Sequence, residues 1–302
     1  MRAGAAVAEL VLVRHGETDW NVERRLQGQQ APGPPLNALG RGQAGVVAAE
    51  LARRFAGGVD AVWSSDLRRA VETAEPIAAA LGVAVQTHAG LRERHLGDLQ
   101  GLTYAEAPSA QPAAWEALQA PGGAARILGG GESLDDLRAR LRATLLHIAA
   151  AHPGGRVVVV SHGGALHAAH AVARGAAAKG KVVNASISVL LAAAGPPPAV
   201  LCRRCRALEQ AQRRPERQPP GTGGDGCSCA DVRTDGAGRG GGGSISIAAD
   251  CTAASAGGAA VPGEHGRPAR DFALLCWNDA KHLANAGALG AGDAFGGSAC
   301  EA

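Results

Sequence analysis

Short apolar runs alternate with longer stretches of helical periodicity over the first 195 residues of the chain. Short runs bounded by polar residues are typical of β-strands, whereas apolar residues that recur every three or four positions are typical of amphipathic helices. The strands predicted in this way are 10–13, 61–64, 83–86, 157–160 and 187–191, and the predicted helices are 41–56, 66–81, 133–151 and 163–174. Strands that alternate with helices predict an α/β fold with a mostly parallel sheet.

The helix predicted at 133–151 has a recognisable start. Ser133 is followed three residues later by Asp136, a spacing that lets each side chain cap the backbone of the other. In a mostly parallel sheet, ligands bind beyond the carboxyl ends of the strands. The residues that directly follow each predicted strand are therefore the first candidates for a functional site.

The longest uncharged run lies between Lys181 and Arg203 and is long enough in principle to cross a bilayer. Polar residues alternate with apolar ones at its start, and three consecutive prolines interrupt it at 196–198. This pattern predicts a strand and a linker, with no membrane association. No transit or signal segment is predicted before the first strand, so the expected location is the cytoplasm, with the chloroplast left open.

Residues 196–270 differ in character from the rest of the chain. They are rich in glycine and arginine and contain few large apolar residues, so burial would not offset the entropy lost on ordering. We predict a disordered insertion that divides one α/β domain into a main part, 1–195, and a final strand with the C-terminal segment, 271–302. The arginines lack the interleaved aromatic residues that stack on single-stranded nucleic acid.

Composition narrows the possible functions. The 302 residues carry 30 Lys and Arg against 27 Asp and Glu, a balance that provides no electrostatic footprint for nucleic acid. None of the seven cysteines precedes Cys202, and the odd count favours a reducing compartment over a disulfide scaffold. A metal site is not predicted. The cysteine pairs 202/205 and 227/229 are a poor match to a zinc knuckle, and His167 and His170 are expected on a helix surface.

The first motif with chemical content is Arg-His-Gly-Glu-Thr-Asp-Trp-Asn at 14–21, directly after the first predicted strand. A histidine held there beside an arginine is suited to attack phosphorus. The Arg14 guanidinium would bind phosphate oxygens and disfavour the imidazolium form of His15. Neutral imidazole is the nucleophilic form.

Three further segments add groups at strand ends. The strand 157–160 is followed by His162, at the sheet edge expected for His15, and by a helix whose N-terminus favours anions. The segment 64–74 places Arg68 and Arg69 at another strand-to-helix turn, where one more guanidinium would complete a phosphate pocket. The polar segment 91–101 contains Glu93, whose pKa a bound phosphate would raise, as suits a general acid.

These motifs together resemble the histidine phosphatase superfamily, also called phosphoglycerate mutase-like proteins. The shared segments are RHGETDWN, LQGQ at 26–29, LNALG at 36–40, SSDLRRAVETA, LRERHLGDLQGL, GGGES at 129–133 and VVVVSHGG. Arg24 also follows the first motif, as it does in the family. The ending NDAKHLANAG at 278–287 and GDAFGG at 292–297 is most similar to plant and algal phosphoglycerate mutase-like phosphatases. The resemblance covers residues 9–195 and 271–297.

The resemblance implies a three-layer α/β/α fold, a phosphohistidine intermediate on His15, and no metal or cofactor. It implies that Arg14, Arg69 and His162 bind the transferred phosphoryl group, with Arg69 chosen over Arg68 because the family pattern is Arg-Ala-x-x-Thr. Glu93 would protonate the leaving group and then activate water. The residues expected to bind substrate are Arg14, Asn21, Gln27, Gly28, Arg69, Glu93, His162 and Gly163.

The same core serves phosphatases and cofactor-dependent phosphoglycerate mutases. A mutase needs additional cations to hold its substrate's carboxylate and second phosphate, whereas Arg126 is the only cation between Leu102 and Ser133. This scarcity favours a phosphatase acting on a small phosphorylated metabolite. The mutase-like spelling of LRERHLG keeps the mutase as an alternative, and a non-catalytic interaction protein on the same fold is a second alternative. The sequence carries no signal for the oligomeric state or for the particular phosphomonoester.

Overall fold

The computed structural model describes residues 7–176, 178–193 and 271–288, and the predicted insertion 196–270 lies outside the described residues. Six strands form one sheet in the order β3-β2-β4-β1-β5-β6. The strands are β1 (Val7–Arg14), β2 (Ala61–Ser64), β3 (Val85–Thr87), β4 (Arg156–Ser161), β5 (Ile187–Ala193) and β6 (Phe272–Asp279). Strands β3, β2, β4 and β1 pair in parallel, whereas β5 and β6 pair antiparallel. The mostly parallel sheet is confirmed.

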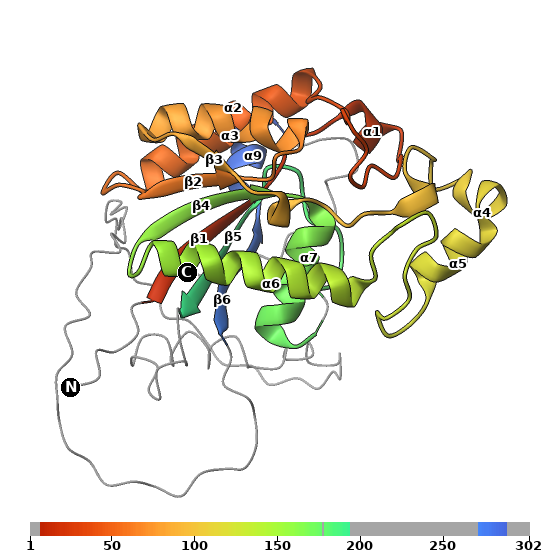
Figure 1. Cartoon of the computed structure of the whole chain (residues 1–302). Helices are drawn as coiled ribbons and strands as arrows, with labels where there is room; N and C mark the ends of the chain where they lie inside the picture. Colours follow the sequence, from red (N-terminus) through yellow and green to blue (C-terminus); the bar gives the residue numbers. More distant parts are fainter. Residues whose placement is uncertain (1–6, 177, 194–270, 289–302) are drawn as a thin grey trace, which may run out of the picture. The chain divides into compact units, whose positions relative to one another are not determined.

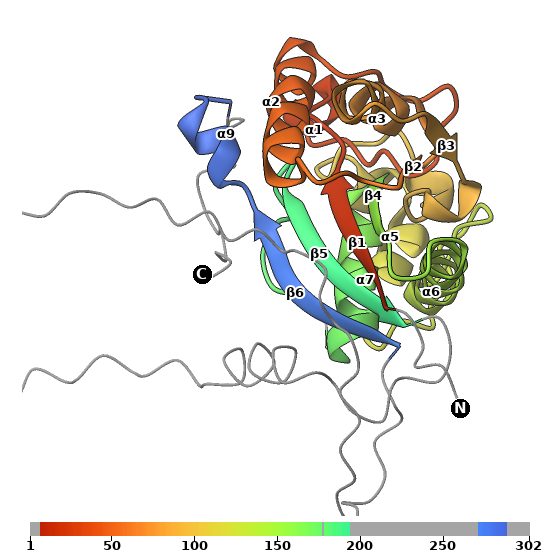
Figure 2. The same cartoon turned by 90° about the vertical axis from the view of Figure 1, so that its left-hand side faces the viewer.

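Helices cover both faces of this sheet, as Figures 1 and 2 show. The helices are α1 (Asp19–Val22), α2 (Ala38–Arg54), α3 (Arg68–Leu81), α4 (Ala107–Ala110), α5 (Pro112–Gln119), α6 (Leu134–Ala151), α7 (Gly163–Arg174) and α9 (Lys281–Asn285), with short 3-10 turns at Ala89–Leu91 and Gly97–Leu99. Helices α2, α3 and α9 lie on one face, and α6 and α7 lie on the other. The predicted three-layer α/β/α fold is confirmed.

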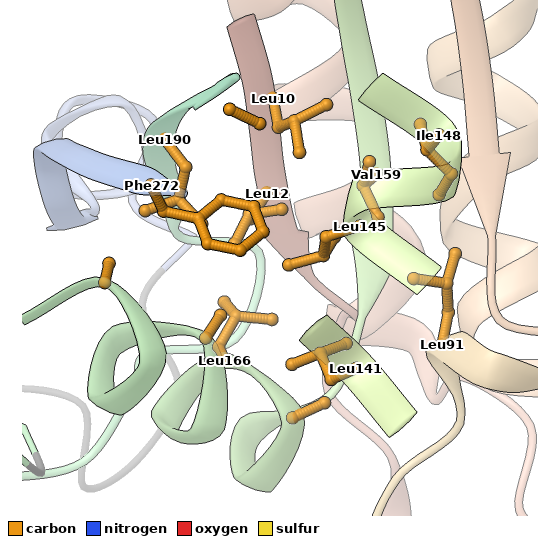
Figure 3. Close-up of a cluster of buried hydrophobic side chains, with 14 of the residues drawn as sticks. Leu10, Leu12, Leu91, Leu141, Leu145, Ile148, Val159, Leu166, Leu190 and Phe272 are labelled. Carbon is orange, nitrogen blue, oxygen red and sulfur yellow. The ribbon is translucent and has the colours of Figure 1, made fainter. Parts of the chain in front are cut away.

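Alternating side chains of the central strands fill two separate cores. Leu10 and Leu12 of β1 face α6 and α7, where they join Leu145 and Leu166 in a buried cluster (Figure 3). The intervening residues Val11 and Val13 belong to a second buried cluster with residues of α2 and α3. A strand buried on both faces reads as a continuous apolar run, which is the reason that the sequence predicts these strands.

Capping residues explain where the boundaries match the sequence prediction and where they shift. The predicted capping box is present, because Ser133 Oγ accepts from the Asp136 amide at 3.0 Å while Asp136 accepts from the Ser133 amide at 2.9 Å. Helix α2 begins three residues earlier than predicted because Asn37 Oδ1 accepts from the Gly40 amide at 2.8 Å. The strand predicted at 83–86 begins at Val85, because the Val83 amide is used to close the end of α3.

The segment 102–131 is more ordered than its sequence indicates. It contains the two short helices α4 and α5, which lie beyond the carboxyl ends of the parallel strands (Figure 1). A third apolar cluster packs the segment against neighbouring loops. It is formed by Leu26, Leu96, Leu99, Ala107, Ala114 and Ile127. Short helices that contain proline carry little periodicity, so only this packing shows that they form.

Residues 271–288 add the sixth strand, β6, to the sheet. Strand β6 lies where the sequence predicts a final strand, and it pairs with β5. Its Trp277 ring lies 6.0 Å from the His167 ring and 4.7 Å from the His170 ring, between centroids. Both histidines lie on α7, where the sequence expects them, and they are half-buried next to the Trp277 ring. Within the described ranges, no helix has both the length and the apolar character needed to span a membrane.

Candidate active site

His15 follows the last residue of β1 and is only 3% exposed. Its Nδ1 lies 2.7 Å from the Gly16 carbonyl oxygen. Because a carbonyl can only accept, Nδ1 carries the hydrogen and Nε2 carries the lone pair. Arg69 Nε donates to that Nε2 at 3.3 Å. The imidazole is therefore held with its nucleophilic nitrogen facing a guanidinium.

Burial and two arginines keep His15 neutral. Its pKa lies well below the usual 6.5, first because burial disfavours the charged form and then because Arg69 and Arg14 repel a proton. The ring is accordingly in its nucleophilic form at neutral pH.

The structure distinguishes the two adjacent arginines at the start of α3. Arg69 is 1% exposed and donates from Nη2 to the Gly28 carbonyl oxygen at 2.9 Å. Its Nη1 is buried without a hydrogen-bond partner in the described part of the chain, and burial lowers its pKa to about 10. Arg68 instead points outward and pairs with Glu72 at 2.7 Å. Buried donors without partners are uncommon, and this one belongs to the guanidinium that contacts the His15 ring.

His162 follows β4 and is the residue from which α7 begins. Its ring centroid lies 5.2 Å from that of His15, so the structure brings the two predicted histidines together. Its Nε2 lies 2.8 Å from Ser65 Oγ, and its Nδ1 is buried without a partner among the described residues. Burial is again the main cause of a strongly lowered pKa, followed by Arg69 and His15.

Arg14 occupies the last position of β1, directly before His15. Its Nη1 donates to the Val182 carbonyl oxygen, which belongs to the loop before β5. A methyl group at Gly163 would lie 3.5 Å from Arg14 Nε, so the backbone at the start of α7 passes close to this guanidinium. Arg14, Arg69, His15 and His162 thus gather at one end of the sheet.

Glu93 approaches the same site from the loop after β3. Its carboxylate accepts hydrogen bonds from the amides of Gly164 and Arg94, both at 2.8 Å. Gly164 lies in the first turn of α7, where the helix dipole favours a negative charge. The Glu93 carbonyl is in turn held by Gln29 Nε2 at 2.9 Å and by Arg140 Nη2 at 3.1 Å.

The remaining predicted site residues form a hydrogen-bonded group around α1. Asn21 closes a capping box with Thr18, and Gln27 Nε2 donates to Thr18 Oγ1 at 2.9 Å. Gly28 has a φ of +50°, which glycine adopts readily. Its carbonyl orients Arg69 as described above. The binding roles of these three residues stay predictions, as do those of the other site residues.

Comparison of the sequence with known protein families identifies the family of this chain. Residues 10–202 match the family model described as the histidine phosphatase superfamily, branch 1. The chain belongs to this superfamily. The resemblance predicted from the motifs is confirmed.

Relatives with known names include phosphatases and a mutase-like protein. The chain is 47% identical over 184 residues to phosphoglycerate mutase-like protein 4 of Arabidopsis thaliana, covering 60% of this chain and 78% of that protein. It is 41% identical over 191 residues to the metal-independent phosphoserine phosphatase of the same plant, covering 63% and 79%. A solved structure of mycobacterial glucosyl-3-phosphoglycerate phosphatase with VO3 is 37% identical at a TM-score of 0.53, covering 60% of this chain and 90% of that chain.

Sequence reasoning missed two polar residues of this histidine phosphatase site. Ser65 contacts His162, and the only sequence signal is a second serine after β2. Asn184 donates from Nδ2 to the His15 carbonyl oxygen at 3.0 Å. The sequence shows Asn184 only as a polar position before the strand predicted at 187–191, and the structure places it in the loop before β5. Across the described ranges, no three His, Cys, Asp or Glu residues are arranged to hold a metal ion.

The buried histidines predict how stability depends on pH. Because the pKa values of His15 and His162 are lowered in the folded state, the unfolded chain binds protons that the folded chain does not as pH falls below 6.5. Stability is therefore expected to decrease as pH falls from that value, by up to roughly 1.4 kcal/mol per pH unit for each of these histidines. Thermal unfolding between about pH 5 and about pH 8 measures the effect. A melting temperature that stays constant across this window would contradict it.

Proposed function

We propose that the protein is a metal-independent phosphatase that hydrolyses a small phosphomonoester in two steps, through a phosphohistidine intermediate on His15. The observation that carries this proposal is the neutral His15, whose Nε2 faces the buried guanidinium of Arg69. This arrangement supports His15 as the nucleophile and Arg69 as a phosphate-binding cation. The named phosphatases among the relatives support the same reaction class.

In the first step, His15 Nε2 attacks phosphorus and forms the N–P bond while the bond to the ester oxygen breaks. The oxygens of the transferring group would be held by Arg14, Arg69 and His162, and by the backbone near Gly163 at the start of α7. Arg69 Nη1 and His162 Nδ1 are buried atoms without protein partners in the described region. Donation from Ser65 Oγ to His162 Nε2 would leave the hydrogen on Nδ1, ready to bind a phosphoryl oxygen.

Glu93 would carry the protons of both steps. As a carboxylic acid it donates its proton to the leaving ester oxygen, and the alcohol departs. As a carboxylate it then takes a proton from water, whose oxygen attacks phosphorus as the N–P bond breaks. Inorganic phosphate leaves, and His15 and the Glu93 acid are regenerated. Asn21, Gln27 and Gly28 would complete the binding site around the substrate.

The cations near the site favour hydrolysis over a mutase reaction. Arg126, the only cation of the segment 102–131, is 68% exposed and pairs with Asp136 at 2.8 Å. The segment therefore offers one exposed cation, already paired with α6, where a mutase needs several for its substrate's second phosphate and carboxylate. Without such groups, a monophosphate product would leave before it could be phosphorylated again.

The test separates the phosphatase from the mutase and from a non-catalytic protein. Purified protein is incubated in EDTA with 3-phosphoglycerate and 2,3-bisphosphoglycerate, and 2-phosphoglycerate and free phosphate are both measured. We expect free phosphate in excess. Dominant formation of 2-phosphoglycerate would establish the mutase, and absence of both products, here and with p-nitrophenyl phosphate, would support the non-catalytic alternative. A panel of phosphoglycerates, phosphoserine and sugar phosphates then ranks the substrates.

The contact between Gly164 and Glu93 predicts a selective loss of turnover in Gly164→Ala. The added methyl group would lie 2.4 Å from Glu93 Oε1, which is closer than a Cβ atom approaches non-bonded atoms in proteins. The carboxylate is the mobile partner, so it should move away from its working position while the fold is kept. We expect kcat to fall by about tenfold to a hundredfold, measured as initial rates on p-nitrophenyl phosphate.

Gly45→Ala is the matched control for this change. Gly45 lies on the exposed side of α2, and a methyl group there would meet no atom within 4 Å. Activity should be unchanged and stability should rise by about 0.5–1 kcal/mol, since alanine favours helix interiors. Equal kcat values for Gly164→Ala and the wild type would show that the position of Glu93 is not limiting.

A further inference from the structure

A single residue of the C-terminal segment connects to the loop behind the catalytic site. Asn278 lies near the end of β6, is 3% exposed and has a φ of +53°. Asparagine is among the few residues other than glycine that adopt this left-handed conformation readily. Its backbone amide donates to Ser188 Oγ at 2.9 Å, so the residue is held at a defined place against β5.

The Asn278 side chain bridges both ends of a tripeptide that lies far away in the sequence. Its Oδ1 accepts from the Val183 amide at 2.8 Å, and its Nδ2 donates to the Lys181 carbonyl oxygen at 3.0 Å. Donor and acceptor of one amide group thus set the orientation of the two peptide units that flank Val182. Both bonds span more than ninety positions of the chain.

The tripeptide in turn contacts the candidate catalytic residues. The Val182 carbonyl oxygen accepts from Arg14 Nη1. Three residues further on, the Ala185 amide donates to the Arg14 carbonyl oxygen at 3.0 Å. The side-chain amide of Asn278 therefore orients the carbonyl that receives the Arg14 side chain.

We propose that Asn278 is a positioning residue, which holds the loop 181–183 so that the Arg14 guanidinium is aimed at the phosphoryl group. The inference deepens the proposed function and rests on it for the role of Arg14. The catalytic site would then be completed from the chain segment that follows the predicted insertion. A truncated protein that ends before β6 would lack this support.

Asn278→Gly tests the proposal, because glycine keeps the left-handed backbone and removes only the side chain. We expect kcat/KM to fall by about tenfold to a hundredfold and the dissociation constant for inorganic phosphate to rise, measured by calorimetry. Asn285→Gly, on the exposed end of α9, is the matched control and should retain wild-type values. Asn278→Asp is the second variant, since it keeps an oxygen that accepts from the Val183 amide, loses the donor to the Lys181 carbonyl, and tolerates the same φ.

A double-mutant cycle with Arg14→Ala shows whether Asn278 acts through Arg14. If it does, Asn278→Gly should change phosphate affinity by less than about twofold once Arg14 is absent. Additive effects in the cycle, or wild-type phosphate affinity in a folded Asn278→Gly or Asn278→Asp variant, would overturn the proposal. Because phosphate binding needs no turnover, a wild-type protein that hydrolyses nothing would refute the proposed function while the cycle still decides the role of Asn278.

Discussion

Replacing His15 by alanine is expected to abolish turnover while leaving the fold intact. Alanine removes Nε2, the atom that would form the N–P bond, and no other described residue has a neutral imidazole nitrogen facing Arg69 in this way. Loss of a nucleophile costs on the order of 10⁴-fold or more in kcat. The measurement is the initial rate on p-nitrophenyl phosphate, together with the melting temperature to verify folding.

Trapping of the intermediate gives this prediction a second readout. Wild-type protein incubated with a ³²P-labelled substrate and quenched in alkali should carry an acid-labile phosphoryl label, and the His15→Ala variant should carry none. His147→Ala serves as the control, because His147 is exposed on α6. An acid-labile label that persists on His15→Ala would show that another residue is the nucleophile.

Replacing Arg69 should cause the second-largest loss. Its guanidinium contacts His15 Nε2 and the Gly28 carbonyl, and Nη1 is buried without a partner among the described residues. Removing one such charged donor costs on the order of 10²–10³-fold in kcat. Arg69→Lys should rescue little, because an ammonium group cannot reproduce a planar fork that contacts His15 and Gly28 at once and keeps a further donor for phosphate.

The pH profile separates this electrostatic role from simple loss of binding. Arg69 lowers the pKa of His15, so its removal should raise that pKa. The acid limb of kcat/KM, where His15 becomes protonated, should therefore move to higher pH in Arg69→Ala. An unchanged acid limb would show that Arg69 does not control the protonation of His15.

The neighbouring arginine provides the matched control. Arg68 is 57% exposed and makes an ion pair with Glu72, and such surface pairs contribute less than about 1 kcal/mol to stability. Arg68→Ala should therefore keep wild-type activity. If Arg68→Ala lost as much activity as Arg69→Ala, the assignment of these two residues would be wrong.

Most of the fold could be predicted from the sequence because its signals are local. Strands β1 and β4 are buried on both faces, so their apolar runs are visible without any knowledge of their neighbours. The capping box of Ser133 is a signal contained in four residues. Boundaries were less predictable where a helix end uses residues that also suit a strand, as at Val83, or where packing alone stabilises short helices, as in 102–131.

The positions of candidate site residues were predictable from the sequence where those residues directly follow a predicted strand. His15 and His162 end neighbouring parallel strands, so the rule that ligands bind at carboxyl ends places them together, and the structure places their rings 5.2 Å apart. The distinction between Arg68 and Arg69 came only from the family resemblance. Burial now supplies its physical reason, since the two side chains leave the helix in different directions.

The sequence by itself determined the order of strands and helices, the candidate catalytic side chains and the family. Only the tertiary structure decided the tautomer of His15, the support of Glu93 by Gly164, and the link from Asn278 to the loop beside Arg14. The physical reason is that tautomers, pKa values and hydrogen-bond partners depend on burial and on neighbours supplied by distant segments. The sequence shows which chemical groups a chain carries, whereas the protonation states and orientations of those groups depend on contacts that form only in the folded chain.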